Sequence, residues 1–220
     1  MKLYTYWRST AAYRVRIALN LKGLQAEQVS VHLVRDGGEQ HREDYRALNP
    51  QGLVPTLVDG DQHLSQSLAI IEYLDERHAE PALLPETAAG RARVRSLAQL
   101  IGCEIHPLNN LRVLQHLEGE FGISGDRRRL DWYHHWLREG FRALEQRLAS
   151  EAETGRFCHG DTPGLADLCL VPQLYNARRF ELPLEDYPHL TAIDAACAEL
   201  SAFRDAAPEA QPDAPAQEAS

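Results

Sequence analysis

The order of strand-like and helical runs at the start of this chain constrains its fold most strongly. Strand-like runs at residues 2–6 and 28–33 flank a helical run at 11–22. The helical run stops at Gly23, a residue that commonly follows the last turn of a helix. A strand, a helix and a strand in this order form a parallel pair with a right-handed crossover. We therefore predict that the fold begins with a β-α-β unit.

A β-hairpin and a second helix complete this first domain. Asp59-Gly60 separates two short strand-like runs and is a strong hairpin signal. The predicted strands cover residues 54–58 and 62–64, and the predicted helix covers residues 67–78, with Ser67 as its N-cap. The expected architecture is an α/β domain of βαβ-ββα order over residues 1–82.

Only helical patterns follow the proline-containing stretch at residues 80–86, which we interpret as an interdomain linker. We predict an all-α domain over residues 88–220. Its predicted helices cover residues 91–117 with a kink at Pro107, 126–152, 164–177 and 189–203, with a loop at 119–125. The tail from Ala206 is rich in Pro, Ala, Glu, Gln and Asp, and its end is expected to be loose.

Charge and composition exclude several functions. A formal net charge of -9 argues against general nucleic-acid binding. No apolar run reaches the roughly 18 residues needed to cross a bilayer, and the first residues lack the apolar core of a signal peptide. We expect a cytoplasmic protein without membrane contact. The four cysteines show no metal-ligand spacing, so we expect no metal site and reduced, mostly buried thiols.

Arg8, Ser9 and Thr10 stand directly before the first predicted helix. The simpler interpretation is that the two hydroxyls are helix N-caps. A helix N-terminus also carries unpaired N–H donors and partial positive charge, which together with a hydroxyl and an arginine would stabilise a thiolate. Position 11 is an alanine, so such a thiolate must arrive with a ligand.

Two further segments fit a small anionic peptide. Val54-Pro55 precedes a strand, and a cis bond there would turn the backbone of Val54 toward an extended ligand. Gln66 and Ser67 begin the next predicted helix, where the hydroxyl is either a cap or part of a carboxylate site.

Longer motifs give the chain a family resemblance. They are Ser9-Thr10-Ala11-Ala12-Tyr13-Arg14-Val15-Arg16-Ile17-Ala18-Leu19, Ala47-Leu48-Asn49-Pro50-Gln51, Val54-Pro55-Thr56-Leu57, Gln66-Ser67-Leu68-Ala69-Ile70-Ile71-Glu72-Tyr73-Leu74, Ile105-His106-Pro107-Leu108-Asn109-Asn110-Leu111-Arg112-Val113-Leu114 and Ala166-Asp167-Leu168-Cys169-Leu170-Val171-Pro172-Gln173. With these motifs the chain resembles the zeta-class glutathione transferases over nearly its whole length. It departs from them at Ala11, where many members carry a cysteine, and at Gly164, where many transferases carry a serine or threonine cap.

The resemblance implies a thioredoxin-like first domain that binds glutathione and a helical domain that faces the substrate. It implies that Ser9, Thr10 and Arg8 are catalytic and that Arg8, Arg112 and Arg179 bind the carboxylates of the substrate. The glutathione-binding residues it implies are Ser9, Thr10, Arg14, Gln40, Val54, Pro55, Gln66, Ser67, His106 and Asn110. His106 has a simpler interpretation as a packed or capping residue, Asn110 as a helix-surface amide, and Arg178-Arg179-Phe180 as a solvated face.

The activity implied is glutathione-dependent cis–trans isomerisation of maleylacetoacetate in aromatic amino-acid breakdown, by reversible thiolate addition to the double bond. Isomerisation of maleylpyruvate, a shorter diacid, is the first alternative. A general glutathione transferase or dehalogenase and a non-catalytic binding protein are the others. The resemblance also implies a homodimer.

Overall fold

The computed structural model describes residues 1–123 and 126–215. Contacts between backbone positions divide the chain into two compact units, Leu84–Cys197 and a first unit that joins Met1–Leu83 to the segment from Ala198 onward. The predicted fold class, a thioredoxin-like α/β domain followed by a helical domain, is confirmed. The predicted domain ranges differ from these units in one respect. The prediction places everything after residue 88 in the helical domain, whereas the chain returns to the first unit at Ala198.

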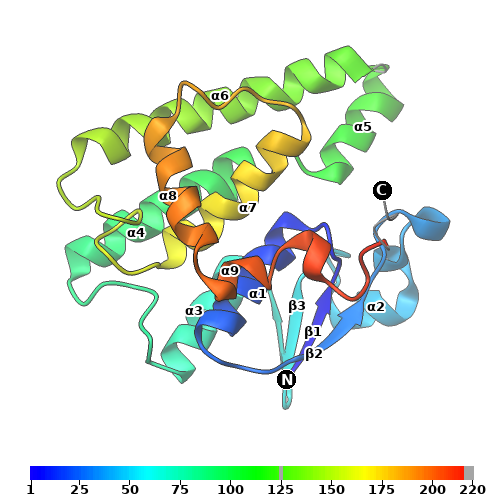
Figure 1. The fold of residues 1–220 in the computed structure, drawn as a ribbon. Helices are drawn as coiled ribbons and strands as arrows, with labels where there is room; N and C mark the ends of the chain where they lie inside the picture. The colour runs from blue at the N-terminus through cyan, green and yellow to red at the C-terminus, as the bar shows by residue number, and fades with distance from the viewer. Residues whose placement is uncertain (124–125, 216–220) are drawn as a thin grey trace. The chain divides into compact units, whose positions relative to one another are not determined.

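The first unit is built on a mixed four-stranded sheet with the order β2-β1-β3-β4 (Figure 1). The strands are β1 (Lys2–Thr5), β2 (Glu27–Ser30), β3 (Thr56–Asp59) and β4 (Gln62–Ser65). β1 pairs in parallel with β2 and antiparallel with β3, and β3 and β4 form the predicted hairpin, in which Gly60 adopts a φ of 58°. Leu3 and Leu57 lie opposite each other in the ladder and are fully buried.

Helices α1 (Thr10–Leu21) and α3 (Ser67–Arg77) pack against each other in this unit. α1 is buried on more than one side, since Val15 and Ile17, two residues apart on the helix, are both fully buried. The predicted cap of α3 is off by one residue, because Gln66 with a φ of 71° is the N-cap and Ser67 is the first helical residue.

Between β2 and β3 the sequence analysis identified no helix, yet the chain forms three short ones there. They are η1 (Arg35–Gly37), η2 (Glu39–His41) and α2 (Glu43–Leu48). Each is too short for the apolar spacing of a helix to repeat, which is the signal on which such predictions depend.

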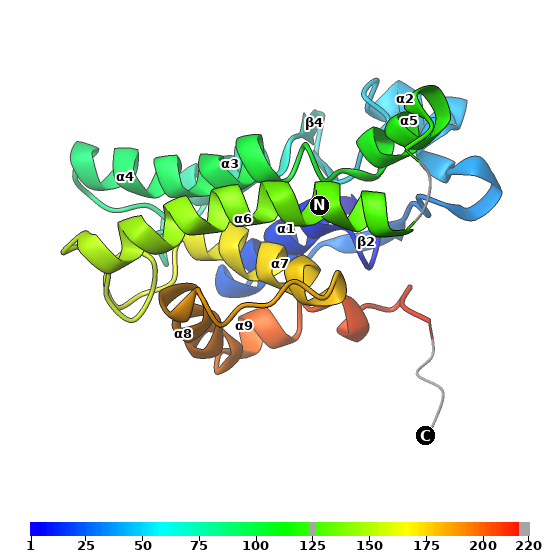
Figure 2. The ribbon, with the colours of Figure 1, turned by 90° about the horizontal axis from the view of Figure 1, so that it is seen from above.

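Within the described residues, the named elements of the second unit are helices (Figure 2). They are α4 (Ala88–Gln99), η3 (Leu100–Ile105), α5 (Leu111–Phe121), α6 (Asp126–Ser150), α7 (Leu165–Arg179) and α8 (Pro188–Ala198). α4 packs on α7, and α6 packs on the π-helical turn η3. Gly140 permits that approach, since a Cβ at this position would lie 2.1 Å from the side chain of Ile105.

Two predicted features in the first half of the helical part are wrong. The helix predicted over 91–117 does not kink at Pro107 but ends before it, because proline cannot continue the hydrogen-bond ladder; α5 then restarts at Leu111. The predicted loop at 119–125 begins late, since α5 continues to Phe121 and Gly122 ends it with a φ of 60°. Residues 124 and 125 of that loop lie outside the described part.

The helix predicted over 189–203 is two helices, α8 and the short α9 (Ser201–Arg204). The described part of the tail, which includes the turn η4 (Pro208–Ala210), is packed, since Ala206, Pro208 and Gln211 are buried. The expected loose end falls on residues 216–220, outside the described part. Within the described residues, no helix is long and apolar enough to cross a membrane.

Candidate active site

The turn from β1 into α1 places Ser9 at the helix N-terminus. The N–H of Ser9 donates to the carbonyl of Tyr6 at 2.9 Å, and the Ser9 Oγ accepts from the N–H of Ala12 at 3.2 Å. Ser9 is therefore the N-cap of α1, as one interpretation of the sequence predicted. Because the cap uses only the oxygen of the hydroxyl, its proton remains able to donate to an anion.

Thr10 and Arg8 flank this cap in different surroundings. Thr10 is the first helical residue and is buried, with 7% of its surface exposed. Arg8 is half-buried, and its guanidinium lies over the ring of Trp7, 5.4 Å from the ring centre. A cation held over an aromatic face is oriented as well as attracted.

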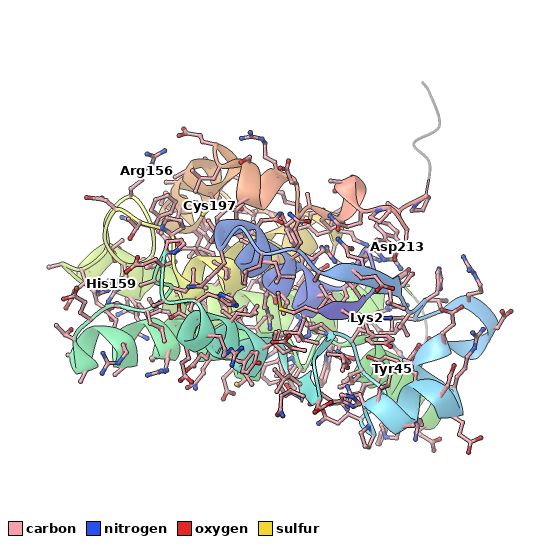
Figure 3. All side chains as sticks on the ribbon, turned by 90° about the horizontal axis from the view of Figure 1, so that it is seen from below. Lys2, Tyr45, Arg156, His159, Cys197 and Asp213 are labelled. Atoms are coloured by element: carbon pink, nitrogen blue, oxygen red, sulfur yellow. The ribbon has the colours of Figure 1, made fainter. Side chains whose placement is uncertain are left out.

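The Val54-Pro55 loop is held from beneath by two buried polar side chains. The hydroxyl of Tyr45 donates to the carbonyl of Leu53 at 2.6 Å, and the amide of Asn49 donates to the same carbonyl at 2.8 Å. Both side chains also contact the hydroxyl of Thr56. Burial raises the pKa of Tyr45, which keeps the hydroxyl protonated as a donor. In Figure 3, Tyr45 projects from α2.

The Val54–Pro55 peptide bond is cis. Val54 is buried, and among the described residues no backbone hydrogen bond engages it. Its N–H and carbonyl are thus able to pair with an extended ligand.

The start of α3 is connected to both α1 and the loop. The buried guanidinium of Arg14 donates to the Oγ of Ser67 at 3.2 Å, and the amide of Gln66 donates to Gln51 at 2.8 Å. With 2% of its surface exposed, Arg14 lies beneath Ser67. Ser67, like Ser9, accepts a hydrogen bond from the protein and keeps its proton for an anion.

Sheet register brings these segments to one end of the first unit. The end of β1, the start of β3 and the end of β4 are adjacent, because Tyr4 pairs with Thr56 and Thr56 pairs with Ser65. Tyr6 and Val54 also belong to one buried apolar cluster, against which Trp7 packs. One end of the sheet therefore carries all three segments: the turn with Ser9, the Val54-Pro55 loop and the start of α3.

Gln40 lies in the short helix η2 and is buried. Its amide nitrogen donates to the carbonyl of Leu33 at 3.2 Å and contacts the His41 ring, and 7% of the residue is exposed. Its predicted role in binding glutathione stays a prediction.

The site residues predicted in the second unit lie at helix ends. Asn110 is the N-cap of α5, and its side-chain oxygen accepts from the N–H of Arg112 at 3.1 Å. His106 lies just after η3, where its N–H donates to the carbonyl of Ile101. Arg112 is exposed at the first turn of α5. The simpler interpretation of Asn110 as a surface amide is thus replaced by a capping role.

Arg179 ends α7 on top of an aromatic stack. Its guanidinium lies 4.9 Å from the ring centre of Phe180, and that ring stacks on Tyr133 at 3.8 Å. Burial raises the pKa of Tyr133 well above its ordinary value, so this ring is neutral. The preceding Arg178 is engaged separately, by Asp194 at 2.6 Å.

The sequence analysis missed four residues that shape the site: Tyr45, Asn49, Arg16 and Asp213. Asn49 and Arg16 stand inside quoted motifs, but no local pattern says that they are buried. Tyr45 lies on a helix too short to show periodicity, and Asp213 lies in a segment with the composition of a loose tail. Asp213 and Arg16 act through contacts across most of the length of the chain, to Trp7 and Ala206 respectively. Tyr45 and Asn49 contact Leu53 and Thr56, which lie nearby in the sequence.

The described residues include no group of three or more His, Cys, Asp or Glu that could hold a metal ion. No disulfide joins any of the four cysteines, which all lie within the described residues, and all but Cys103 are buried. The expectation of reduced, mostly buried thiols is consistent with this arrangement.

Comparison with known proteins identifies the family. Residues 3–82 match the glutathione S-transferase N-terminal domain, and residues 131–206 match the glutathione S-transferase C-terminal domain. The chain belongs to the glutathione S-transferase family. Its fold and its similarity to known proteins place it in the zeta class of that family.

Three relatives locate the chain within that class. It is 53% identical to a probable maleylacetoacetate isomerase of Vibrio cholerae, over 96% of this chain and 97% of that protein. It is 52% identical, with a TM-score of 0.94, to the holo structure of a bacterial zeta-class maleylpyruvate isomerase, over 98% of this chain and all of that one. A maleylacetoacetate isomerase of Methylobacterium extorquens, with bound malonate and glutathione, gives 46% identity and a TM-score of 0.94 over 98% of this chain and all of that one.

Proposed function

We propose that this chain is a glutathione-dependent cis–trans isomerase that converts maleylacetoacetate to fumarylacetoacetate. The observation that carries the proposal is the hydroxyl of Ser9, which caps α1 through its oxygen and keeps a proton for an anion. Position 11 holds an alanine. The protein therefore supplies a thiolate site at this helix end but no thiol of its own.

The residues of the first unit fit glutathione. The backbone of Val54 would pair with the cysteinyl residue, and Gln66 with Ser67 at the start of α3 would hold the γ-glutamyl carboxylate. Arg14 supports this carboxylate site by fixing the oxygen of Ser67, rather than by contact with the ligand. The relative from Methylobacterium extorquens binds glutathione.

Glutathione, when bound, supplies the thiolate that adds to the double bond and allows it to rotate. A free cysteine thiol has a pKa of about 8.5 and is mostly protonated at neutral pH. The Ser9 hydroxyl and the N–H groups of the first turn of α1 would stabilise the charged form and lower that pKa. Thr10 is buried beside it, so we assign the main donor role to Ser9.

Arginines would bind the carboxylates of the diacid. Arg8 precedes Ser9 directly and is oriented by the Trp7 ring, and Arg112 and Arg179 are the further candidates on the second unit. Guanidinium groups recognise carboxylates through paired hydrogen bonds and stabilise negative charge that spreads during the reaction. The Methylobacterium extorquens relative holds malonate, also a diacid.

Maleylpyruvate isomerisation is the second candidate. The observation that favours it is the similarity to the zeta-class maleylpyruvate isomerase, at 52% identity and a TM-score of 0.94. The same chemistry serves both substrates, which differ in length.

A spectrophotometric isomerase assay, run with and without glutathione on both substrates, tests the proposal. We expect isomerisation only with glutathione and a higher kcat/KM for maleylacetoacetate; a higher value for maleylpyruvate would establish the second candidate. A glutathione conjugate as the end product would instead indicate a general transferase. Failure to bind a glutathione column would indicate a non-catalytic protein.

The homodimer and the cytoplasmic location implied by the resemblance belong to the same proposal. Sedimentation velocity measures the first, with a single species of twice the chain mass as the expected result.

A further inference from the structure

The C-terminal segment makes direct contact with the turn that carries Ser9. The carboxylate of Asp213 accepts from the backbone N–H of Trp7 at 3.0 Å and from the hydroxyl of Ser30 at 2.8 Å. Both bonds use the same oxygen, and the other oxygen is buried without a hydrogen-bond partner among the described residues. In Figure 3, Asp213 lies on the C-terminal segment, above strands β1 and β2. Both hydrogen bonds of this carboxylate thus go to residues at the end of β2 and just beyond the end of β1.

A buried arginine joins the same segment to the same turn. Arg16 donates to the carbonyl of Ala206 at 3.0 Å and to the carbonyl of Trp7 at 3.0 Å. It also contacts the carbonyl of Tyr6 and the hydroxyl of Thr5. Trp7 is therefore held at its N–H by Asp213 and at its carbonyl by Arg16, which also binds the C-terminal segment.

The segment is itself fixed between these two anchors. Gln211 is buried, and its amide nitrogen donates to the carbonyls of Asp205 and Ala207 at 3.0 and 2.8 Å. Its side-chain oxygen accepts from Gln28 of β2 at 3.2 Å. Asp213 is thus presented by an ordered segment.

Trp7 in turn positions the side chains of Ser9 and Arg8. Ser9 follows two residues later, within the turn closed by its bond to Tyr6, and Arg8 lies over the Trp7 ring. A shift of this peptide would move the Ser9 hydroxyl and the Arg8 guanidinium together.

We propose that Asp213 is a positioning residue for the thiolate site, which acts by fixing the backbone of Trp7 and thereby the directions of Ser9 and Arg8. The proposal rests on the proposed function, since it assigns Asp213 to the same site. On this view the C-terminal segment is part of the structure that forms the thiolate site.

Three variants test this role. Asp213→Ala removes the acceptor of the Trp7 N–H, Asp213→Asn keeps a neutral acceptor oxygen there, and Ser30→Ala removes only the second bond of the carboxylate. Amide hydrogen exchange over residues 4–12 reports the order of the turn. The ultraviolet absorbance of the bound thiolate against pH reports its ionisation, and kcat with the dissociation constant of glutathione reports function.

For Asp213→Ala we expect exchange at least tenfold faster at Trp7 and a bound thiol with a raised pKa. We expect kcat to fall about tenfold, since a misplacement of about 1 Å can cost up to about a hundredfold. The glutathione dissociation constant should change by less than about threefold, because Val54 and Ser67 keep their supports. Asp213→Asn and Ser30→Ala should stay within about twofold of the parent in kcat.

Faster exchange with unchanged kcat and thiol ionisation would leave Asp213 a merely structural residue and overturn the proposal. So would an Asp213→Asn variant as impaired as Asp213→Ala, because the acceptor would then not be the relevant property. A parent that lowers the thiol pKa of bound glutathione but isomerises neither diacid would overturn the proposed function alone. The thiol ionisation of the variants would still decide the role of Asp213.

Discussion

Ser9 and Thr10 are adjacent hydroxyls at the start of α1, and the backbone gives them different environments. The extended conformation of Ser9 directs its oxygen back to the N–H of Ala12, which leaves its proton to an incoming anion. Thr10 already has helical geometry and is buried. The sequence alone does not decide which of the two hydroxyls donates to the thiolate, because both are acceptable cap residues.

Replacing Ser9 by alanine should raise the pKa of bound glutathione by about one unit, the effect of losing one hydrogen bond to a thiolate. The acid limb of the kcat/KM profile should move to higher pH by the same amount. Thr10→Ala is the matched control and should leave both quantities near those of the parent. An equal or larger shift in Thr10→Ala would reverse the assignment of the two hydroxyls.

Arg8→Ala should reduce turnover far more than glutathione affinity. The expected loss in kcat/KM for the diacid is about 10- to 100-fold, corresponding to a charged hydrogen bond of about 1.5–3 kcal/mol. Arg8→Lys should recover little of it, because an ammonium cannot form the paired bonds of a guanidinium. Steady-state kinetics and calorimetric titration of glutathione measure the two effects. Arg77→Ala, at the exposed far end of α3, is the control, and parental turnover in Arg8→Ala would rule out the role.

Among the elements, those with strong local signals could be predicted from the sequence. α1 and the β3-β4 hairpin have regular spacing and glycines at Gly23 and Gly60, both of which adopt positive φ. The capping role of Gly164 at α7 could also be expected. The position of all three site segments at one end of the sheet depends on strand register, which no single segment encodes.

Other elements could not be predicted because tertiary contacts decide them. Pro107 fits either a kink or a stop, and the capping of α5 by Asn110 makes it a stop. The C-terminal segment has the composition of a solvated tail, and its order comes from partners about two hundred residues earlier, such as Trp7 and Arg16.

The start of α7 provides a test of stability at the level of one helix. Asp167 is fully buried, and its carboxylate accepts from the N–H groups of Gly164 and Cys158, each at 2.8 Å. Asp167→Asn turns an amide donor toward one of these N–H groups. We expect a loss of about 2 kcal/mol in the free energy of unfolding, as for a buried polar group left without its partner.

The pH dependence of that loss has a defined sign. Burial raises the pKa of Asp167, against the opposing effect of the two backbone N–H bonds. The folded state therefore binds a proton more strongly than the unfolded state, and the contribution of Asp167 is greatest below the unfolded pKa and falls as the pH rises through the folded pKa. Urea unfolding of parent and variant between pH 4.5 and 7 should show a difference that shrinks toward pH 7. A difference that grows with pH would mean that the N–H bonds outweigh burial.

At the scale of the whole molecule, the chain leaves the first unit after Leu83 and returns to it at Ala198. α9 packs on α1, and the carbonyls of Ala202 and Phe203 accept from Asn20 and Tyr13. Phe203 itself is 1% exposed. The first unit is therefore completed by residues that follow the second unit in the sequence.

A chain that ends at Cys197 should fail to form a stable first unit. It would lose the burial of Phe203, worth about 3–5 kcal/mol by the cost of such a residue's truncation to alanine, and leave Arg16 without the carbonyl of Ala206. Since a domain is stable by only about 5–15 kcal/mol, we expect loss of glutathione binding and of one cooperative step in thermal unfolding. A chain that ends at Pro215 keeps every described residue and is the control. If the chain ending at Cys197 bound glutathione with parental affinity, Met1–Leu83 would form the cofactor site without the segment from Ala198 onward. That result would also disprove the dependence of the turn with Ser9 on the C-terminal residues.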